Sequence, residues 1–274
     1  MKTLVKTSLL SLMLGTLGIC SISSAVAQGN ADLRAAIDGE HRSDLNRTRD
    51  VYRNPYETLT FFGVESDDVV IEAWPGGGWY TEILAAYLQD EGTLIGATYD
   101  RSAEPLAGWM SGSNAMFQRL LDSNTEAYGD VVVSEQLTQA QSQIAAPGSV
   151  DVILDFRNAH NWIGMGADNV IMAWHDALKP GGTVGIVDHR WNADEAAIAG
   201  NGYIHEQQLI DLMTGHGFTF AGSSEINANP NDPKTHEGGV WMLPPNLRGL
   251  SAEQRPMYQA IGESDRMTMK FIKN

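Results

Sequence analysis

Short apolar runs alternate with polar and glycine-containing segments along most of the chain. Runs of this length are typical of parallel strands that are buried on both faces of a sheet. Between them, apolar residues recur at helical spacing, which predicts helices at residues 81–88, 167–178 and 203–216. This alternation predicts an α/β fold with a mostly parallel sheet. The predicted strands occupy residues 69–71, 93–100, 131–133, 150–154, 183–190 and 218–224, with a final strand at 267–271 and an extended segment at 239–245.

Three consecutive glycines follow the first predicted strand. Gly76, Gly77 and Gly78 can adopt backbone angles closed to other residues and leave room for a ligand to come close. A turn of this kind aims backbone N–H groups and a helix N-terminus at the space above the strand. Ligands of open α/β sheets bind there, outside the carboxyl ends of the strands. We therefore expect a binding site at this turn.

Acidic residues stand at or just after the ends of the next two predicted strands. Asp100 comes about 20 residues after the glycines, where a carboxylate can accept hydrogen bonds from the ribose hydroxyls of a nucleoside. A turn aspartate that only starts the next loop is the alternative. Glu135 follows the third strand, and a solvated acid at a strand end explains it equally well.

Polar side chains crowd the ends of the fourth and fifth strands. Asp155, Arg157 and His160 come just after the fourth strand, in the expected loop, and Asp188 and His189 end the fifth. A site at the carboxyl edge of a sheet needs such a cluster. An imidazole side chain can act as a general base near neutral pH, which makes His160 a candidate for that role. A histidine that only makes structural hydrogen bonds is the alternative.

The N-terminus has the features of a secretory signal peptide. Lys2 and Lys6 precede an apolar stretch at residues 9–19, and residues 25–27 form an Ala-Val-Ala cleavage site. The mature chain is then expected to start at Gln28 and to be periplasmic or secreted. The apolar stretch is too short for a convincing membrane span. Cys20, the one cysteine, lies in the removed segment, which excludes a disulfide scaffold and a thiol nucleophile.

The chain is strongly acidic. Its 274 residues carry a formal charge of −16, and loss of Lys2 and Lys6 with the signal peptide takes this to about −18. Such a charge disfavours nucleic acid and anionic membranes as partners. Small-molecule substrates remain the expected partners, and the charge identifies none of them.

Residues 28–63 form a predicted helical segment ahead of the first strand. Helices are expected at about residues 32–41 and from Pro55 onward. One interpretation is a lid whose arginines pair with the acidic body, and the other is that some of these side chains reach the active site. The side chains in question are Arg47, Arg49, Tyr52 and Arg53.

The glycine-rich turn resembles the first motif of class I S-adenosylmethionine-dependent methyltransferases. Glu72 matches the motif acid, Gly76 and Gly78 match two of its glycines, and Trp74 stands where the first glycine usually lies. The sequence Leu-Lys-Pro-Gly-Gly at residues 178–182, followed by a strand, is a second methyltransferase signature. From about residue 45, the chain is also similar to a family of exported predicted methyltransferases of unassigned substrate. This second resemblance is carried by residues 49–63, 74–82, 156–162, 187–190, 229–232 and 261–266.

The resemblance implies a Rossmann-like three-layer α/β/α sandwich spanning residues 64–274. Its sheet would have seven strands, with the last inserted antiparallel between the fifth and sixth. S-adenosylmethionine is the implied cofactor. The residues implied to hold it are Glu72, Pro75, Gly76, Gly77, Gly78, Asp100, Glu135, Asp155 and Phe156. The implied catalytic residues are His160, Asp155, His189, Asp188 and Arg157, with His160 or His189 as base and Asp155 or Asp188 orienting it.

The predicted export conflicts with a methyl donor that is made in the cytoplasm. A second hypothesis is therefore a non-catalytic or repurposed protein that binds another nucleoside-like or small ligand. A dehydrogenase is a third hypothesis, opposed by Thr81 in place of the third glycine of a dinucleotide fingerprint. Convergence of His160, Asp188 and His189 on a metal is conceivable, but no ligand spacing supports it, so no metal is predicted.

Overall fold

The computed structural model describes residues 29, 31–101 and 106–274. The predicted signal peptide at residues 1–27 and its cleavage site lie outside this range. Residues 31–38 form the first described helix, somewhat shorter than the predicted 32–41. The N-terminal segment continues through α2 (Asp44–Arg47), α3 (Asp50–Arg53) and α4 (Pro55–Phe62), and α4 begins at Pro55 as predicted.

Strands and helices then alternate as the apolar pattern predicts. The first βα unit is β1 (Val69–Ala73) and α5 (Thr81–Leu88), and the helix has the predicted bounds. The chain continues with β2 (Thr93–Tyr99), α6 (Gly108–Ser123), α7 (Thr125–Tyr128), β3 (Val132–Gln136), β4 (Val150–Phe156), α8 (Ala159–Ala177), β5 (Leu178–His189), α9 (Glu206–Gly215), β6 (Phe218–Ser224), η1 (Gly239–Met242), α10 (Arg255–Ile261) and β7 (Arg266–Lys273).

One seven-stranded sheet runs through the molecule in the order β3-β2-β1-β4-β5-β7-β6. The neighbouring strands from β3 to β5 pair in parallel, and β7 pairs antiparallel with both β5 and β6. The predicted insertion of the last strand between the fifth and sixth is therefore confirmed. Because β7 runs the opposite way, its first residues lie at the carboxyl edge of the other strands.

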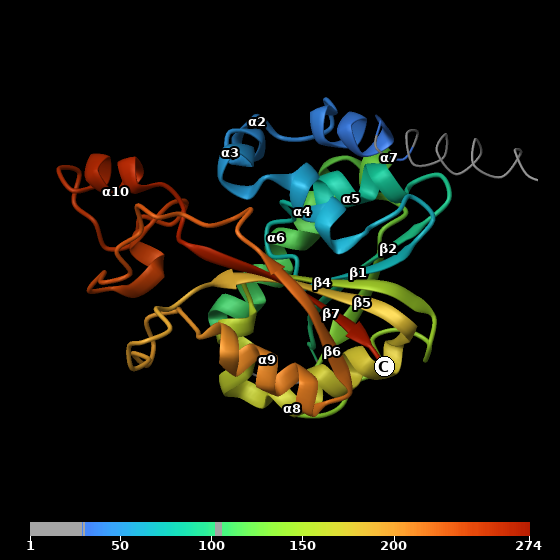
Figure 1. Cartoon of the computed structure of the whole chain (residues 1–274). Coiled ribbons are helices and arrows are strands. Elements are labelled where there is room, and N and C mark those ends of the chain that lie inside the picture. The colour runs from blue at the N-terminus through green and yellow to red at the C-terminus, as the bar shows by residue number, and fades with distance from the viewer. Residues whose placement is uncertain (1–28, 30, 102–105) are drawn as a thin grey trace, which may run out of the picture.

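Helices cover both faces of the sheet (Figure 1). On one face, α8 and α9 pack on a core that includes Ile153, Trp174 and Met269. On the other face, α4 to α7 pack on a core that includes Phe62 and Leu84. Alternate residues of each strand contribute to the two cores, so both faces are apolar. The predicted three-layer α/β/α sandwich is confirmed.

Three expectations about individual elements are wrong. The predicted helix at residues 167–178 begins at Ala159, with a break at Gly166, whose φ of 151° is not helical. His160 therefore lies in the first turn of α8 instead of a loop. The predicted helix at residues 203–216 begins only at Glu206, because Ile204 pairs with Arg190 as an isolated bridge. Residues 239–245, expected to be extended, start with the 3-10 helix η1.

The third strand is not buried as predicted. β3 is the edge strand of the sheet, where Val132 and Val133 are 49% and 38% exposed. Their apolar run alone cannot distinguish an edge strand from a central one, since strand order is a tertiary property. Within the described part of the chain, no helix is long and apolar enough to cross a membrane.

Candidate functional site

The glycine-rich turn joins β1 to α5 at the carboxyl edge of the sheet. Gly76 and Gly78 have φ angles of 61° and 74°, which favour glycine, and the Gly78 N–H donates to the Pro75 carbonyl at 2.9 Å. A Cβ atom added at Gly76 or Gly77 would meet nothing within 4 Å. Among the described residues, the N–H groups of Gly76 and Gly77 have no hydrogen-bond partner. Free backbone donors beside open space fit a ligand that carries acceptor groups.

Trp74 also adopts a left-handed conformation, with a φ of 47°. Bulky side chains rarely do so, because the Cβ atom crowds the backbone. The Trp74 ring is buried and stacks on Tyr99 with ring centroids 5.6 Å apart. This contact holds a backbone shape that glycine would adopt freely, which explains how tryptophan can stand at this position.

Glu72 lies in β1 beneath the turn and is 3% exposed. Thr81 Oγ1, at the start of α5, donates a hydrogen bond to Glu72 Oε2 at 2.5 Å. Burial raises the pKa of Glu72 to about 8, against the opposing effects of this hydrogen bond and of the Arg53 charge. Glu72 thus ties the start of α5 to β1, and its contact with a ligand stays a prediction.

Asp100 and Glu135 lie at the same edge as the glycine-rich turn. Asp100 directly follows β2 and is 8% exposed. Glu135 lies in β3 opposite Thr98 of β2, and its Oε1 accepts a hydrogen bond from Arg101 Nε at 3.1 Å. The fold therefore places both predicted acids where strands β2 and β3 end.

Gln136 is a buried polar residue at the end of β3 that the sequence pattern did not single out. Its Oε1 accepts a hydrogen bond from Trp174 Nε1 at 3.1 Å, whereas its Nε2 has no partner among the described residues. Buried donors without a partner are rare in folded proteins. Gln136 therefore joins the residues that can contact a ligand at this edge. No sequence signal marked it, since polar residues commonly end strands.

Asp155 and Phe156, at the end of β4, point to opposite faces of the sheet. Asp155 is fully buried and accepts hydrogen bonds from Asn158 Nδ2 at 3.0 Å and from Trp162 Nε1 at 2.8 Å. Burial, together with the charge of Asp188, raises the pKa of Asp155 to about 7. Phe156 stacks on Tyr80, with ring centroids 3.5 Å apart. Asp155 therefore orders the β4–α8 connection and does not contact His160 directly.

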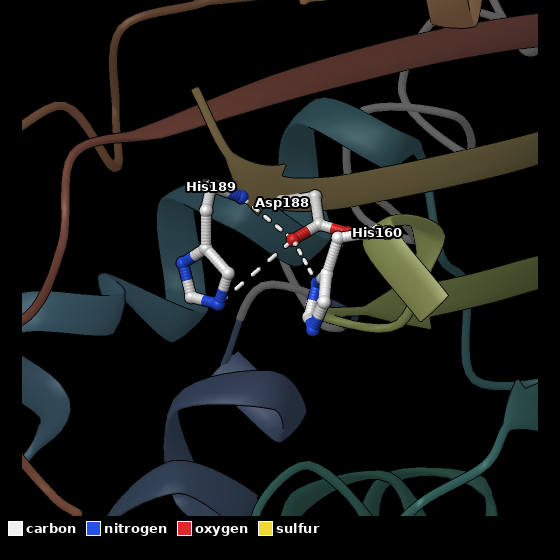
Figure 2. Close-up of side chains that lie close together, drawn as sticks. All are labelled: His160, Asp188 and His189. Atoms are coloured by element: carbon white, nitrogen blue, oxygen red, sulfur yellow. Dashed lines mark hydrogen bonds and ion pairs between the residues drawn. The ribbon is translucent and has the colours of Figure 1, made fainter. Parts of the chain in front are cut away.

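His160 and Asp188 form a hydrogen-bonded pair between α8 and β5 (Figure 2). The Asp188 carboxylate accepts from His160 Nδ1 at 2.9 Å and from the backbone N–H groups of His160 and His189 at 2.9 and 2.7 Å. A carboxylate only accepts, so His160 Nδ1 carries its proton and Nε2 is left as an acceptor. Of the two predicted orienting acids, Asp188 is the one in contact with His160.

His189 lies beside this pair, with its ring centroid 5.1 Å from that of His160. Its Nδ1 is 2.6 Å from Ser264 Oγ, and its Nε2 is 3.9 Å from Asp188 Oδ1. Burial lowers the pKa of His189 well below its usual range, and the nearby His160 and Arg157 lower it further. His189 is therefore neutral at physiological pH and is less suited than His160 to take up a proton.

Arg157 follows β4 in a left-handed conformation, with a φ of 67°. Its backbone N–H donates to the Val187 carbonyl at 2.8 Å, which fixes the residue between β4 and β5. Its guanidinium group makes no hydrogen bond or ion pair with another described residue. Burial lowers the pKa of Arg157. The fold thus brings Arg157 to the predicted site without assigning it a structural partner.

The N-terminal arginines divide into two groups. Arg47 pairs with Asp44 at 2.7 Å within α2, away from the site. Arg49 and Arg53 pair with Glu263, which precedes β7, at 2.8 and 3.2 Å. Pairing with an acid of the body agrees with the first interpretation of this segment. Because Glu263 stands at the carboxyl edge, the same pairs also carry two arginines toward the predicted site.

The predicted convergence of His160, Asp188 and His189 is found. One ligand-type atom from each lies within 4.8 Å of the others. Asp188 is already hydrogen-bonded to His160 and to two backbone N–H groups, and His189 Nδ1 contacts Ser264. These hydrogen bonds explain why the three side chains lie close together.

A large open cavity of about 1250 Å³ lies beyond the end of β5, between the segment that starts at Arg190 and helix α9. Neither the glycine-rich turn nor His160, Asp188 or His189 lines it. Its walls include Ile163, Arg190, Trp191, His205, Lys234 and Asp265.

Comparison with known proteins identifies the fold. No family model matches the sequence, and no curated protein matches it. Among solved structures, an S-adenosylmethionine-dependent methyltransferase from Aquifex aeolicus is similar, with a TM-score of 0.55 and 11% identity over 89% of this chain and 98% of that chain. Geranyl diphosphate C-methyltransferase from Streptomyces coelicolor has a TM-score of 0.53 and 12% identity, over 88% of each chain.

The chain therefore has the Rossmann-like fold of class I S-adenosylmethionine-dependent methyltransferases. The Streptomyces enzyme was solved with Mg²⁺, geranyl diphosphate and S-adenosyl-L-homocysteine. At 11–12% identity these likenesses concern the fold, and they define no substrate for this chain.

Proposed function

We propose that this chain binds S-adenosylmethionine and transfers its methyl group to a small-molecule acceptor after export from the cytoplasm. The observation that carries the proposal is the turn after β1, where Gly76 and Gly77 offer free N–H groups beside open space. Asp100 follows the adjacent strand, where a ribose-binding acid is expected. Solved proteins with this fold hold S-adenosylmethionine or its product, which supports the same cofactor here.

The residues of the β1, β2 and β3 strand ends would hold the donor. The free N–H groups of the turn can bind its acceptor atoms, and the Asp100 carboxylate can accept from its ribose hydroxyls. Gln136 Nε2 offers a further donor near the expected position of the adenine. Glu72 supports this arrangement from below through its hydrogen bond with Thr81.

When bound, the donor supplies a methyl group that its sulfonium has already activated. The main task of the protein is then to align an acceptor for in-line attack, which contributes up to about 7–11 kcal/mol in favourable cases. His160 Nε2 takes the proton of an acceptor hydroxyl or amine, and Asp188 stabilises the resulting imidazolium through Nδ1. His189 and Ser264 fix the neighbouring wall of the site.

Calorimetric titration with S-adenosylmethionine and S-adenosylhomocysteine tests the proposal. We expect micromolar binding to the purified protein, and its loss in Asp100→Ala. Asp130→Ala, which removes an exposed acid after α7, serves as the matched control. If the folded protein binds neither compound, the methyltransferase proposal is wrong.

The predicted signal peptide favours one second candidate, a repurposed fold that binds another nucleoside-like or small ligand. This candidate predicts that native mass spectrometry of the isolated protein detects a different bound compound. It also predicts that Asp100→Ala changes the binding of that compound. Any methyl transfer would be the same in the variant and in the wild type.

A further inference from the structure

Four arginines gather around one acid at the carboxyl edge of the sheet. Glu263 accepts hydrogen bonds from Arg49 Nε at 2.8 Å, Arg53 Nε at 3.2 Å and Arg266 Nη1 at 3.0 Å. Arg157 is close enough for its charge and that of Glu263 to affect each other's pKa. We refer to Arg49, Arg53, Arg157 and Arg266 as the arginine cluster.

The arginine cluster is held together by residues far apart in the sequence. Arg49 and Arg53 come from the N-terminal segment, Arg157 from the β4–α8 connection, and Arg266 from the first residue of β7. Arg53 also lies 4.8 Å from the centre of the Trp79 ring. Because β7 is antiparallel, its N-terminal end meets the carboxyl ends of β4 and β5, and the cluster forms only there.

The cluster has an excess of positive charge, since its four guanidinium groups lie near the carboxylates of Glu263 and Asp188, and the buried Glu72 near Arg53 keeps its proton. Arginine stays protonated in proteins, so this charge cannot be relieved by deprotonation. Burial lowers the pKa of Arg53 and Arg157, and the neighbouring arginines lower both further. Burial alone would raise the pKa of Glu263, but the charges of Arg53, Arg266, Arg157 and Arg49 outweigh it and lower the pKa to about 2. Nearby carboxylates therefore do not fully balance the positive charge of the cluster, although the chain as a whole has a net charge of −16.

Several N–H groups of the cluster also lack acceptors. Among the described residues, Arg49 Nη2, Arg157 Nε and Arg266 Nε are buried without a hydrogen-bond partner. Arg157 makes no side-chain hydrogen bond or ion pair at all within residues 29, 31–101 and 106–274. Arg157 and Arg49 retain partial exposure, whereas Arg53 and Arg266 are 5% and 3% exposed. An external ligand would therefore have to contact the cluster through the exposed parts of Arg157 and Arg49, with the charges of Arg53 and Arg266 behind them.

The cluster adjoins the residues assigned to acceptor activation. Arg157, Arg266 and Arg53 each lower the pKa of His189, so their charges lie close to its ring. Arg266 of β7 pairs with His189 of β5, and the Arg157 N–H donates to the Val187 carbonyl at 2.8 Å, so the cluster meets the end of β5 where Asp188 and His189 lie. A group bound by Arg157 would therefore lie on the acceptor side of the site, beside His160 and Asp188.

We propose that the arginine cluster binds an oxyanion of the methyl acceptor, a carboxylate or a phosphate, through Arg157 and Arg49. This rests on the proposed function, since it names the acceptor as an anionic small molecule. The planar guanidinium fork matches both oxyanions in a bidentate manner. Such an anchor positions the remaining atoms of the acceptor near His160 Nε2. The chain as a whole is acidic and repels anions. The arginine cluster is a local region of positive charge that attracts an anion.

A purely structural role explains part of the cluster. The pairs of Arg49 and Arg53 with Glu263 tie the N-terminal segment to β7. Arg266 supports the same contact by donating to the Tyr52 carbonyl. Arg157 makes none of these hydrogen bonds or ion pairs, so a structural role leaves its side chain unexplained.

Calorimetric titration with inorganic phosphate, and separately with acetate, tests the inference at ionic strength held constant with sodium chloride. We expect saturable binding of at least one anion to the purified protein. Arg157→Gln is expected to weaken it about tenfold or more, as loss of a charged hydrogen bond does. Arg157→Lys keeps the charge but loses the fork, so an intermediate loss is expected. Arg255→Gln, at an exposed position in α10, is the matched control.

The two anions distinguish the sources of the oxyanion. Binding of phosphate alone points to a phosphorylated acceptor, and binding of acetate points to a carboxylic acid. If neither anion binds, or if Arg157→Gln binds as the wild type does, the inference is wrong. Circular dichroism checks folding, and Arg49→Gln carries the same test if Arg157→Gln does not fold.

The titration contains no methyl donor, so its result is independent of the proposed function. Failure of S-adenosylmethionine to bind would leave oxyanion binding unchanged. Failure of both anions to bind would leave donor binding unchanged and would remove only the assignment of the acceptor class.

Discussion

Replacing Glu72 by glutamine is expected to change how the stability of the protein depends on pH. Glu72 is 3% exposed, and burial raises its pKa from 4.5 to about 8. Between these two pH values the folded protein keeps a proton that the unfolded chain releases. The stability of the wild type therefore falls as pH rises through this window and levels off above about pH 8.

The size of the effect follows from the width of the window. Each pH unit in which one state binds one more proton changes the free energy of unfolding by about 1.36 kcal/mol. For Glu72 the full window, from 4.5 to about 8, corresponds to a loss on the order of 5 kcal/mol. Glu72→Gln keeps the shape and can still accept from Thr81 Oγ1, but it has no proton to lose. Its stability relative to the wild type should therefore increase steadily across the window.

Urea unfolding followed by tryptophan fluorescence measures this difference at about pH 5, 6.5 and 8. We expect the advantage of Glu72→Gln over the wild type to grow by a few kcal/mol from the lowest pH to the highest. Glu57→Gln removes an exposed carboxylate from α4 and controls for the loss of a charge as such. A difference between Glu72→Gln and the wild type that is the same at all three pH values would refute the reasoning.

Four further predictions concern the site. Gly78→Ala should destabilise the protein by about 1–2 kcal/mol in thermal unfolding, because alanine is strained at a φ of 74°. Gly77→Ala should leave stability almost unchanged, since its Cβ meets nothing within 4 Å, but should weaken donor binding in calorimetry; equal affinity would place the donor elsewhere. Asp188→Asn should lower turnover by about 10²–10⁴-fold with donor affinity retained, and full turnover would exclude His160 as the oriented base. Dialysis against a chelator should leave the melting temperature and turnover unchanged, and a loss restored by added metal would assign the His160, Asp188 and His189 cluster to metal binding.

The strands and their layers could be predicted from the sequence because strands that are buried on both faces of the sheet appear as short apolar runs. β6 has the predicted bounds, and so does α5, whose apolar residues recur at helical spacing. The start of α8 could not be predicted, because it depends on Asp188, 28 residues further along the chain, accepting from the His160 N–H. Helix N-termini need such acceptors, and a tertiary partner leaves no local signal.

The candidate site was predictable at the level of the strand ends. Because parallel strands end at one edge, Asp100, Asp155 and Asp188 had to lie along the same edge of the sheet. Which acid meets which side chain was not predictable, because Asp155 and Asp188 have different partners: Asp155 bonds Trp162, and Asp188 bonds His160. The sequence pattern pointed to residues 261–266 only through family resemblance and assigned no role to Glu263.

The antiparallel insertion of β7 explains why the proposed acceptor side of this site is built differently from the proposed donor side. Parallel strands bring only their final residues to the carboxyl edge, and those residues form the expected donor site. β7 brings its first residues there instead, so Glu263, Ser264 and Arg266 face the ends of β4 and β5. Glu263 then recruits Arg49 and Arg53 from the N-terminal segment. The acceptor side therefore combines both ends of the chain, and differences in those ends can change the acceptor while the donor site stays the same.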